Sequence, residues 1–72
     1  MHSEYRSRLI DSLLAMKGNS DDAFINQVRT IGVTATRGLL SSEATRLHHA
    51  DQQTAMDCAA LVDRIDALIR TA

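Results

Sequence analysis

Apolar residues recur at helical spacing through the first part of the chain. Tyr5, Leu9 and Leu13 follow one another at intervals of four residues. This spacing places their side chains on one face of a helix, which we expect to be buried, so the pattern predicts a helix over about residues 3–17. Gly18 follows directly, and glycine readily adopts the left-handed backbone conformation that ends many helices.

A second helical pattern begins after Ser20. The Ser20 hydroxyl can accept a hydrogen bond from the first turn, and the two aspartates that follow it suit the positive end of a helix dipole. Phe24 and Val28 supply an apolar face. We expect this helix over about residues 21–32, with Gly32 as its C-terminal cap.

The stretch after Gly32 allows two interpretations. Apolar residues keep helical spacing through the glycine as far as Leu39, which would extend the second helix. Several β-branched residues and Gly38 are weak helix formers, however. We therefore predict a connector over about residues 33–40 and keep the continuous helix as the alternative.

The C-terminal part carries the most regular pattern. From Leu40 to Ala72, one row of positions alternates spacings of four and three, as in a heptad repeat. The row predicts a long amphipathic helix over about residues 42–71. The alternative is a break near Asp51, whose carboxylate can cap a new helix.

Polar residues interrupt the middle of this row, at Asp51 and Thr54. Burying a carboxylate is costly unless it is paired, so we expect both side chains to be exposed because the helix overhangs or breaks there. In the alternative they are buried and fix the register of an interface, and the neighbouring His48 would then make assembly sensitive to pH.

The size of the chain favours self-association. Of 72 residues, 44% are apolar but only 3% are aromatic, and the single cysteine, Cys58, has no partner for an internal disulfide bond. A core this small rarely contributes more than about 3–5 kcal/mol on its own. We predict one all-α domain over residues 1–72, a small bundle of three or four helices completed by dimerisation. The predicted self-association seam consists of apolar positions of the long helix: Leu47, Leu61, Ile65, Leu68 and Ile69.

Charge and hydropathy exclude some classes of protein. The net charge of −1 is unlike the basic composition of proteins that coat nucleic acid. No apolar run approaches the roughly 20 residues of a membrane span, and the start of the chain lacks the uncharged core of a signal peptide. We expect a cytoplasmic protein with no membrane partner.

The chemistry-bearing residue types gather around His48 and His49. Each histidine is followed four residues later by a glutamine, which is a poor metal ligand, and adjacent histidines project about 100° apart on a helix. No serine, threonine or cysteine has a base and an orienting group at a recognisable spacing. We predict no enzymatic activity, no metal site and no cofactor.

A DNA-binding function is the alternative that the sequence offers. Gly32 could form the turn of a helix-turn-helix motif, and Arg37 would then lie on the following helix, in reach of a phosphate or a guanine. Gly38 and Ser41 fall where such a helix needs packing side chains, and the region holds few basic residues. The alternative is thus a helix-turn-helix-like transcriptional regulator that uses the segment Gly32–Arg46.

The better-supported function is protein–protein interaction. Long amphipathic helices, a thin core and no site chemistry favour a small regulatory module that docks helix faces on a target protein or on itself, as a homodimer. An inhibitor, an anti-activator, an immunity or antitoxin partner and a chaperone-like adaptor all fit, a profile we expect of small prokaryotic or phage proteins. The candidate target-contact residues are basic or histidine side chains: Arg37, Arg46, His48 and His49.

Overall fold

The computed structural model describes residues 2–71, and this part of the chain is all-α, as predicted. Four helices follow one another without any strand between them. They are α1 (His2–Ala15), α2 (Asp21–Ile31), α3 (Val33–Arg46) and α4 (Gln52–Thr71).

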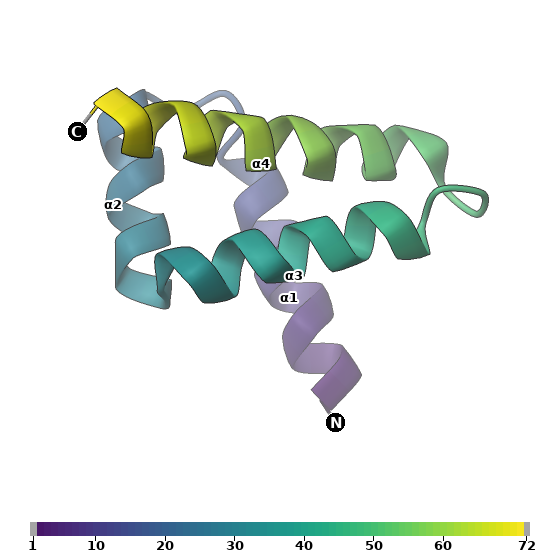
Figure 1. Ribbon diagram of the computed structural model, residues 1–72. Coiled ribbons are helices and arrows are strands. Elements are labelled where there is room, and N and C mark those ends of the chain that lie inside the picture. Colours follow the sequence, from purple (N-terminus) through teal and green to yellow (C-terminus); the bar gives the residue numbers. More distant parts are fainter. Residues whose placement is uncertain (1, 72) are drawn as a thin grey trace.

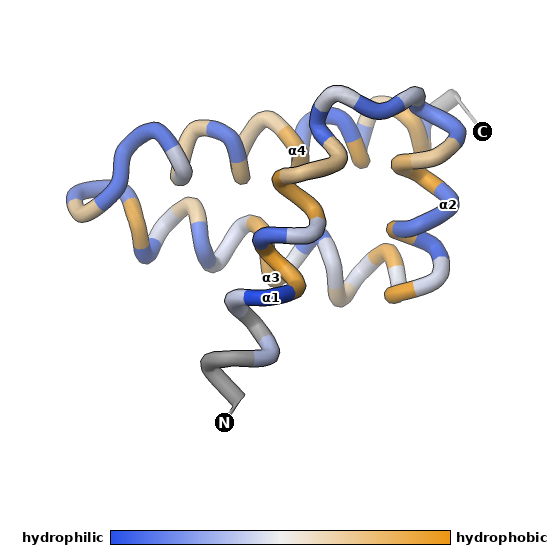
Figure 2. Tube along the Cα trace, turned by 180° about the vertical axis from the view of Figure 1, so that it is seen from behind, coloured by the Kyte–Doolittle hydropathy of each residue, from blue (hydrophilic) through white to orange (hydrophobic). Residues whose placement is uncertain are grey.

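The centre of the fold is an antiparallel hairpin of α3 and α4, which make the most extensive contact of any two helices (Figure 1). Helix α1 crosses one face of this hairpin, and α2 stands across the end where α3 begins and α4 finishes. Figure 2 shows the same arrangement from behind, with α1 in front of the hairpin. The opposite face of the hairpin has no helix of the described chain over it.

Helix α2 forms as its sequence predicts. The Ala23 amide donates to the Ser20 hydroxyl at 3.2 Å, which satisfies one of the unpaired N–H groups of the first turn. At the other end, the Gly32 amide donates to the Val28 carbonyl at 2.8 Å. Gly32 has φ 118°, a value open to glycine and strained for other residues.

The predicted connector over residues 33–40 is wrong, because α3 begins immediately after Gly32. The Thr36 amide already donates to the Gly32 carbonyl at 2.9 Å. Thr36 and Leu40 are fully buried, and Val33 packs against the same core. Burying one large aliphatic side chain contributes about 1.5–3 kcal/mol, which outweighs helix propensity penalties of a few tenths per residue.

The predicted unbroken helix over residues 42–71 is also wrong, and the alternative break near Asp51 is confirmed. Asp51 is exposed, and its carboxylate accepts hydrogen bonds from the Thr54 amide at 3.2 Å and the Thr54 hydroxyl at 2.7 Å. The apolar row continues across the break because α3 and α4 fold back onto one shared core. A hairpin therefore produces the same periodicity as one long helix.

Helix α1 ends without the left-handed glycine that we expected at Gly18. Among the described residues, Gly32 is the glycine with positive φ. The last turn of α1 tightens instead, with the Met16 amide donating to the Leu13 carbonyl at 3.1 Å and the Lys17 amide to the Leu14 carbonyl at 3.2 Å.

The core lies between the hairpin and the two N-terminal helices. Its one aromatic side chain is Phe24, which is fully buried, whereas Tyr5 is 69% exposed. The prediction that Tyr5 belongs to the buried face of its helix is wrong, because the start of α1 extends past α3 (Figure 1). The largest fully buried apolar side chains are those of Phe24, Leu13, Leu40, Ile65 and Val28.

Candidate docking site on the α3–α4 hairpin

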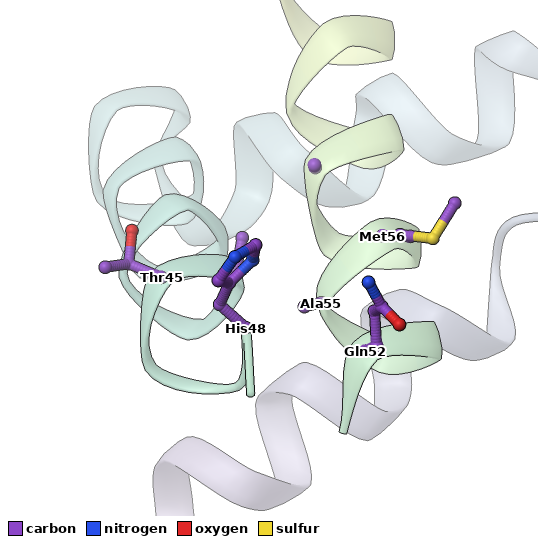
Figure 3. A pocket seen from close by; sticks show the side chains of 7 residues that line it. Thr45, His48, Gln52, Ala55 and Met56 are labelled. Carbon is purple, nitrogen blue, oxygen red and sulfur yellow. The ribbon is translucent and has the colours of Figure 1, made fainter. Parts of the chain in front are cut away.

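A pocket of about 270 Å³ opens between the end of α3 and the start of α4. Figure 3 shows His48 on the α3 side of it and Gln52, Ala55 and Met56 on the α4 side. The lining is mixed, with three alanines and Met56 as its apolar part and Thr45, His48 and Gln52 as its polar part. We call its seven lining residues the outer face: Ala44, Thr45, His48, Gln52, Ala55, Met56 and Ala59.

The outer face lies away from α1. Lys17 Nζ is 3.4 Å from Asp57 Oδ2, and Arg64 Nη2 is 2.6 Å from the Asn19 carbonyl oxygen, so Asp57 and Arg64 mark the side of α4 that meets the end of α1. Each residue of a helix advances by about 100°, so Ala59 projects about 200° away from Asp57. No described helix covers the side on which Ala59 lies.

Met56 is the most exposed large apolar side chain of the hairpin, at 61%. Along α4, Cys58, Leu61 and Ile65 turn into the core, and Met56 lies outside that row. Sequence periodicity did not indicate Met56, because Met56 lies outside the heptad row. A methionine outside the heptad row and next to alanines was the one sign in the sequence of an exposed apolar site.

Arg37, a predicted target-contact residue, links the two helices of the hairpin. Its Nε and Nη2 atoms lie 2.8 and 3.2 Å from the two carboxylate oxygens of Asp66. This paired hydrogen bond lowers the pKa of Asp66 and raises that of Arg37. The Arg37 side chain is half-exposed, but its charge is matched within the chain.

Arg46, the second predicted basic contact, pairs with a buried carboxylate. Its Nε and Nη2 atoms lie 3.0 and 2.6 Å from the carboxylate oxygens of Glu43, one turn earlier on α3. The Glu43 side chain is only 8% exposed, and its hydrogen bonds raise the pKa of Arg46. Arg46 therefore helps to hold a carboxylate inside the fold.

The two predicted histidines lie in the turn between α3 and α4, and both are exposed. Their rings meet edge to face with centroids 4.7 Å apart. His48 also borders the pocket. The structure thus brings one of the four predicted target-contact residues, His48, into the outer face.

The predicted self-association seam does not form one exposed surface. Leu61 is 3% exposed and Ile65 is fully buried, so both are covered by the chain's own core. Leu47 and Leu68 are half-buried, and Ile69 is 42% exposed. The hairpin explains this outcome, because folding α4 onto α3 covers the face that a single long helix would have offered to a partner.

Arg64 is an important residue that the sequence did not reveal. Its guanidinium donates to the Asn19 carbonyl at 2.6 Å and to Asp21 Oδ1 at 2.8 and 3.0 Å, and it lies over the Phe24 ring. These partners are 40 to 45 residues away in the chain, so no local pattern indicates them.

Residue types that could bind metal do not converge in the described residues. No group of three His, Cys, Asp or Glu side chains is placed to hold an ion there. Cys58 is fully buried, and burial raises the pKa of its thiol, with the charges of Glu43 and Asp57 adding to the effect. None of the helices from α1 to α4 is long and apolar enough to cross a membrane.

The pair of helices joined at Gly32 has the order of a helix-turn-helix motif but a shorter turn. A single residue separates α2 from α3, whereas the motif usually has three or four. Gly38 and Ser41 are exposed, and the two arginines of α3 each pair with a carboxylate. These contacts give no support to a role of α3 in reading DNA.

No family model, no curated protein and no solved structure matches this chain.

Proposed function

We propose that the protein is a small non-enzymatic regulatory module that acts by docking the outer face of its α3–α4 hairpin on a partner protein. The partner is another protein, a second copy of the chain, or both in turn. The observation that carries the proposal is the 61% exposure of Met56 beside the pocket, on a face that no described helix covers.

The side chains of this face suit a helical partner. Ala44, Ala55 and Ala59 are small, which lets a partner helix come close to the hairpin, since interaxial distance depends on the side chains at the contact. Methionine is flexible and polarizable, so Met56 can adapt to the surface that it meets. An amphipathic helix laid along a groove is a recurrent mode of recognition with these properties.

The proposal includes action in a reducing compartment such as the cytoplasm. Its support is the single cysteine, Cys58, which is buried as a free thiol.

Capture from host cells tests the proposal, with two neighbouring alanines of α4 as a matched pair. Ala59 lines the pocket, whereas Ala60 is exposed outside it. We expect the wild type and Ala60→Arg to retain the same partner protein, and Ala59→Arg to retain at least tenfold less. Equal helical content by circular dichroism ensures that the comparison concerns folded proteins.

The same experiment with added nuclease separates the DNA-binding alternative. A protein partner stays bound after nuclease treatment, whereas a nucleic-acid bridge is lost. Retention of nothing by the wild type, or equal retention by Ala59→Arg, would overturn the proposed docking role of this face.

A further inference from the structure

We propose that α1 is a lid, which opens as one unit about Gly18 while α2 and the α3–α4 hairpin stay folded. We call α2 and the hairpin together the body. The lid lies on the side of the hairpin away from the outer face, so this inference goes beyond the docking function and does not depend on it. Its support comes from the packing of α1, from the hydrogen bonds on either side of Gly18 and from the core of the body.

Helix α1 is the least extensively packed helix of the described chain. It packs on α3 and α4 but not along α2, and its contact with each of them is smaller than either contact that α2 makes with the hairpin. Within the described part of α1, the buried side chains are Ile10 and Leu13. Tyr5 is exposed, because the first half of α1 extends past α3 (Figure 1). About two turns of helix, from Leu9 to Met16, therefore pack the lid onto the core.

The hydrogen bonds of Arg64 change in length across Gly18. On the body side, its Nη2 atom donates to the Asn19 carbonyl at 2.6 Å, and its Nη2 and Nε atoms donate to Asp21 Oδ1 at 2.8 and 3.0 Å. On the lid side, its Nη1 atom lies 3.4 and 3.5 Å from the carbonyl oxygens of the two residues before Gly18. Hydrogen bonds of that length are weak. Arg64 therefore anchors the chain after Gly18 and holds the chain before it only loosely.

Gly18 has the properties of a pivot. It is exposed, nothing lies within 4 Å of the place a β-carbon would take, and glycine rotates freely about its backbone bonds. One backbone hydrogen bond crosses it, from the Asn19 amide to the Met16 carbonyl at 2.9 Å. An ion pair of 3.4 Å also joins Lys17 Nζ to Asp57 Oδ2, and ion pairs that solvent can reach contribute little. Opening at Gly18 therefore breaks few polar contacts.

The body keeps a core of its own when the lid opens. Phe24 and Val28 of α2 and Leu40 and Ile65 of the hairpin are fully buried in one apolar cluster. The released lid loses its helix, because isolated helices of about 12–15 residues are marginal in water and α1 has 14. Opening therefore turns the lid into a substrate for proteases while the body stays protected.

Limited proteolysis by trypsin tests the lid, because the chain has a cleavage site in each part. Arg8 lies in the lid and Arg37 in the body. At low trypsin concentration, the rate of the first cut at a site follows the population of the opened form. We expect the wild type to be cut first after Arg8, at least tenfold faster than after Arg37, as measured by mass spectrometry of the initial products.

Two buried residues form a matched pair for this test, Leu13 in the lid and Val28 in the body. Leu13→Ala should speed the cut after Arg8 at least tenfold, because Leu13 leaves its site when the lid opens. Val28→Ala should speed the cut after Arg37 to a similar extent and leave the cut after Arg8 unchanged, because Val28 stays buried in the open form.

Three results would overturn the lid. Equal acceleration of the cut after Arg8 by both substitutions would show that α1 opens only when the whole chain unfolds. No acceleration by Leu13→Ala would show that only the first turns of α1 fray. A Leu13→Ala variant that circular dichroism shows to be unfolded would mean that the body does not persist without the lid.

A stabilising substitution replaces Val28→Ala if that variant does not fold. Thr36→Val removes an unpartnered buried hydroxyl from the body and should slow the cut after Arg37 about fivefold. The cut after Arg8 should keep its rate. Equal slowing at the two sites would overturn the independent opening of α1.

Discussion

The guanidinium carbon of Arg64 lies 4.5 Å from the centroid of the Phe24 ring. The same guanidinium donates to the Asn19 carbonyl and to the Asp21 carboxylate, so one side chain of α4 holds the turn between α1 and α2. Arginine suits this position because its planar group stacks on a ring while its edges donate hydrogen bonds.

Replacing Arg64 should destabilise the fold. Arg64→Met keeps most of the apolar stem but loses the hydrogen bonds and the contact with the ring. We expect a loss of about 1.5–3 kcal/mol in the free energy of unfolding, measured by urea denaturation. Arg29→Met, at an exposed position of α2, should change it by less than about 0.5 kcal/mol. Equal effects of the two substitutions would contradict a specific role of Arg64.

Thr36→Val should stabilise the protein. Thr36 is fully buried, and its hydroxyl has no hydrogen-bond partner in the described structure. Valine has nearly the same shape without the unsatisfied hydroxyl, so we expect a gain of about 1 kcal/mol, visible as a higher thermal midpoint. Thr36→Ser keeps the hydroxyl and loses a buried methyl group, so it should destabilise. A destabilised valine variant would show that the hydroxyl is satisfied in solution.

Two glycines should respond in opposite ways to alanine. Gly32→Ala forces a β-carbon onto a backbone with φ 118° and should cost about 1–3 kcal/mol. Gly38 lies inside α3 with nothing within 4 Å of the place a β-carbon would take. Gly38→Ala should therefore add about 0.5–1 kcal/mol of stability. Chemical denaturation of both variants measures the difference in the free energy of unfolding. A loss of stability in Gly38→Ala would show that another group occupies the space beside Gly38.

The capping carboxylate of Asp51 should make stability depend on pH. Its hydrogen bonds with Thr54 lower the pKa of Asp51 below the ordinary value of 3.8 in the folded state. A carboxyl group with a lowered folded-state pKa stabilises the fold above its unfolded pKa, and this contribution is lost as pH falls through the folded-state pKa. Asp51→Ala should thus lower the thermal midpoint at pH 7.

The gap between the thermal midpoints of the wild type and Asp51→Ala should then narrow below about pH 4. Asp63→Ala is the control, since the described residues give the exposed Asp63 no ion pair or hydrogen bond. A gap that is constant from pH 7 to pH 2.5 would show that the Asp51 carboxylate does not cap the helix.

The sequence predicted helix α2 well because its ends are marked by local chemistry. The Ser20 hydroxyl and the conformational freedom of Gly32 act within one turn, and both lie where the pattern placed them. The break at Asp51 was marked in the same local way, but the continuous apolar row outweighed it in the prediction. A row shared by two helices of a hairpin cannot be distinguished by periodicity from one helix.

Helix α3 and the pocket could not be predicted in the same way. Individual propensities around Thr36 oppose a helix, and burial against helices elsewhere in the chain reverses that preference. The pocket exists only because the chain turns back between α3 and α4, which brings the end of α3 beside the start of α4. Asp66, the partner of Arg37, lies 29 residues away in the chain and could not be read from a local pattern. Glu43, the partner of Arg46, lies three residues before it, and the pair was missed because most of α3 was predicted as a connector.

The short turn between α3 and α4 has a consequence for the order of folding. The two helices with the largest contact are neighbours in the chain, so closing the hairpin costs little loop entropy. We expect the hairpin to form early and its amides to be the last to exchange with solvent, while α1 joins later. The outer face belongs wholly to this hairpin, so we expect its shape to persist when the N-terminal helix opens.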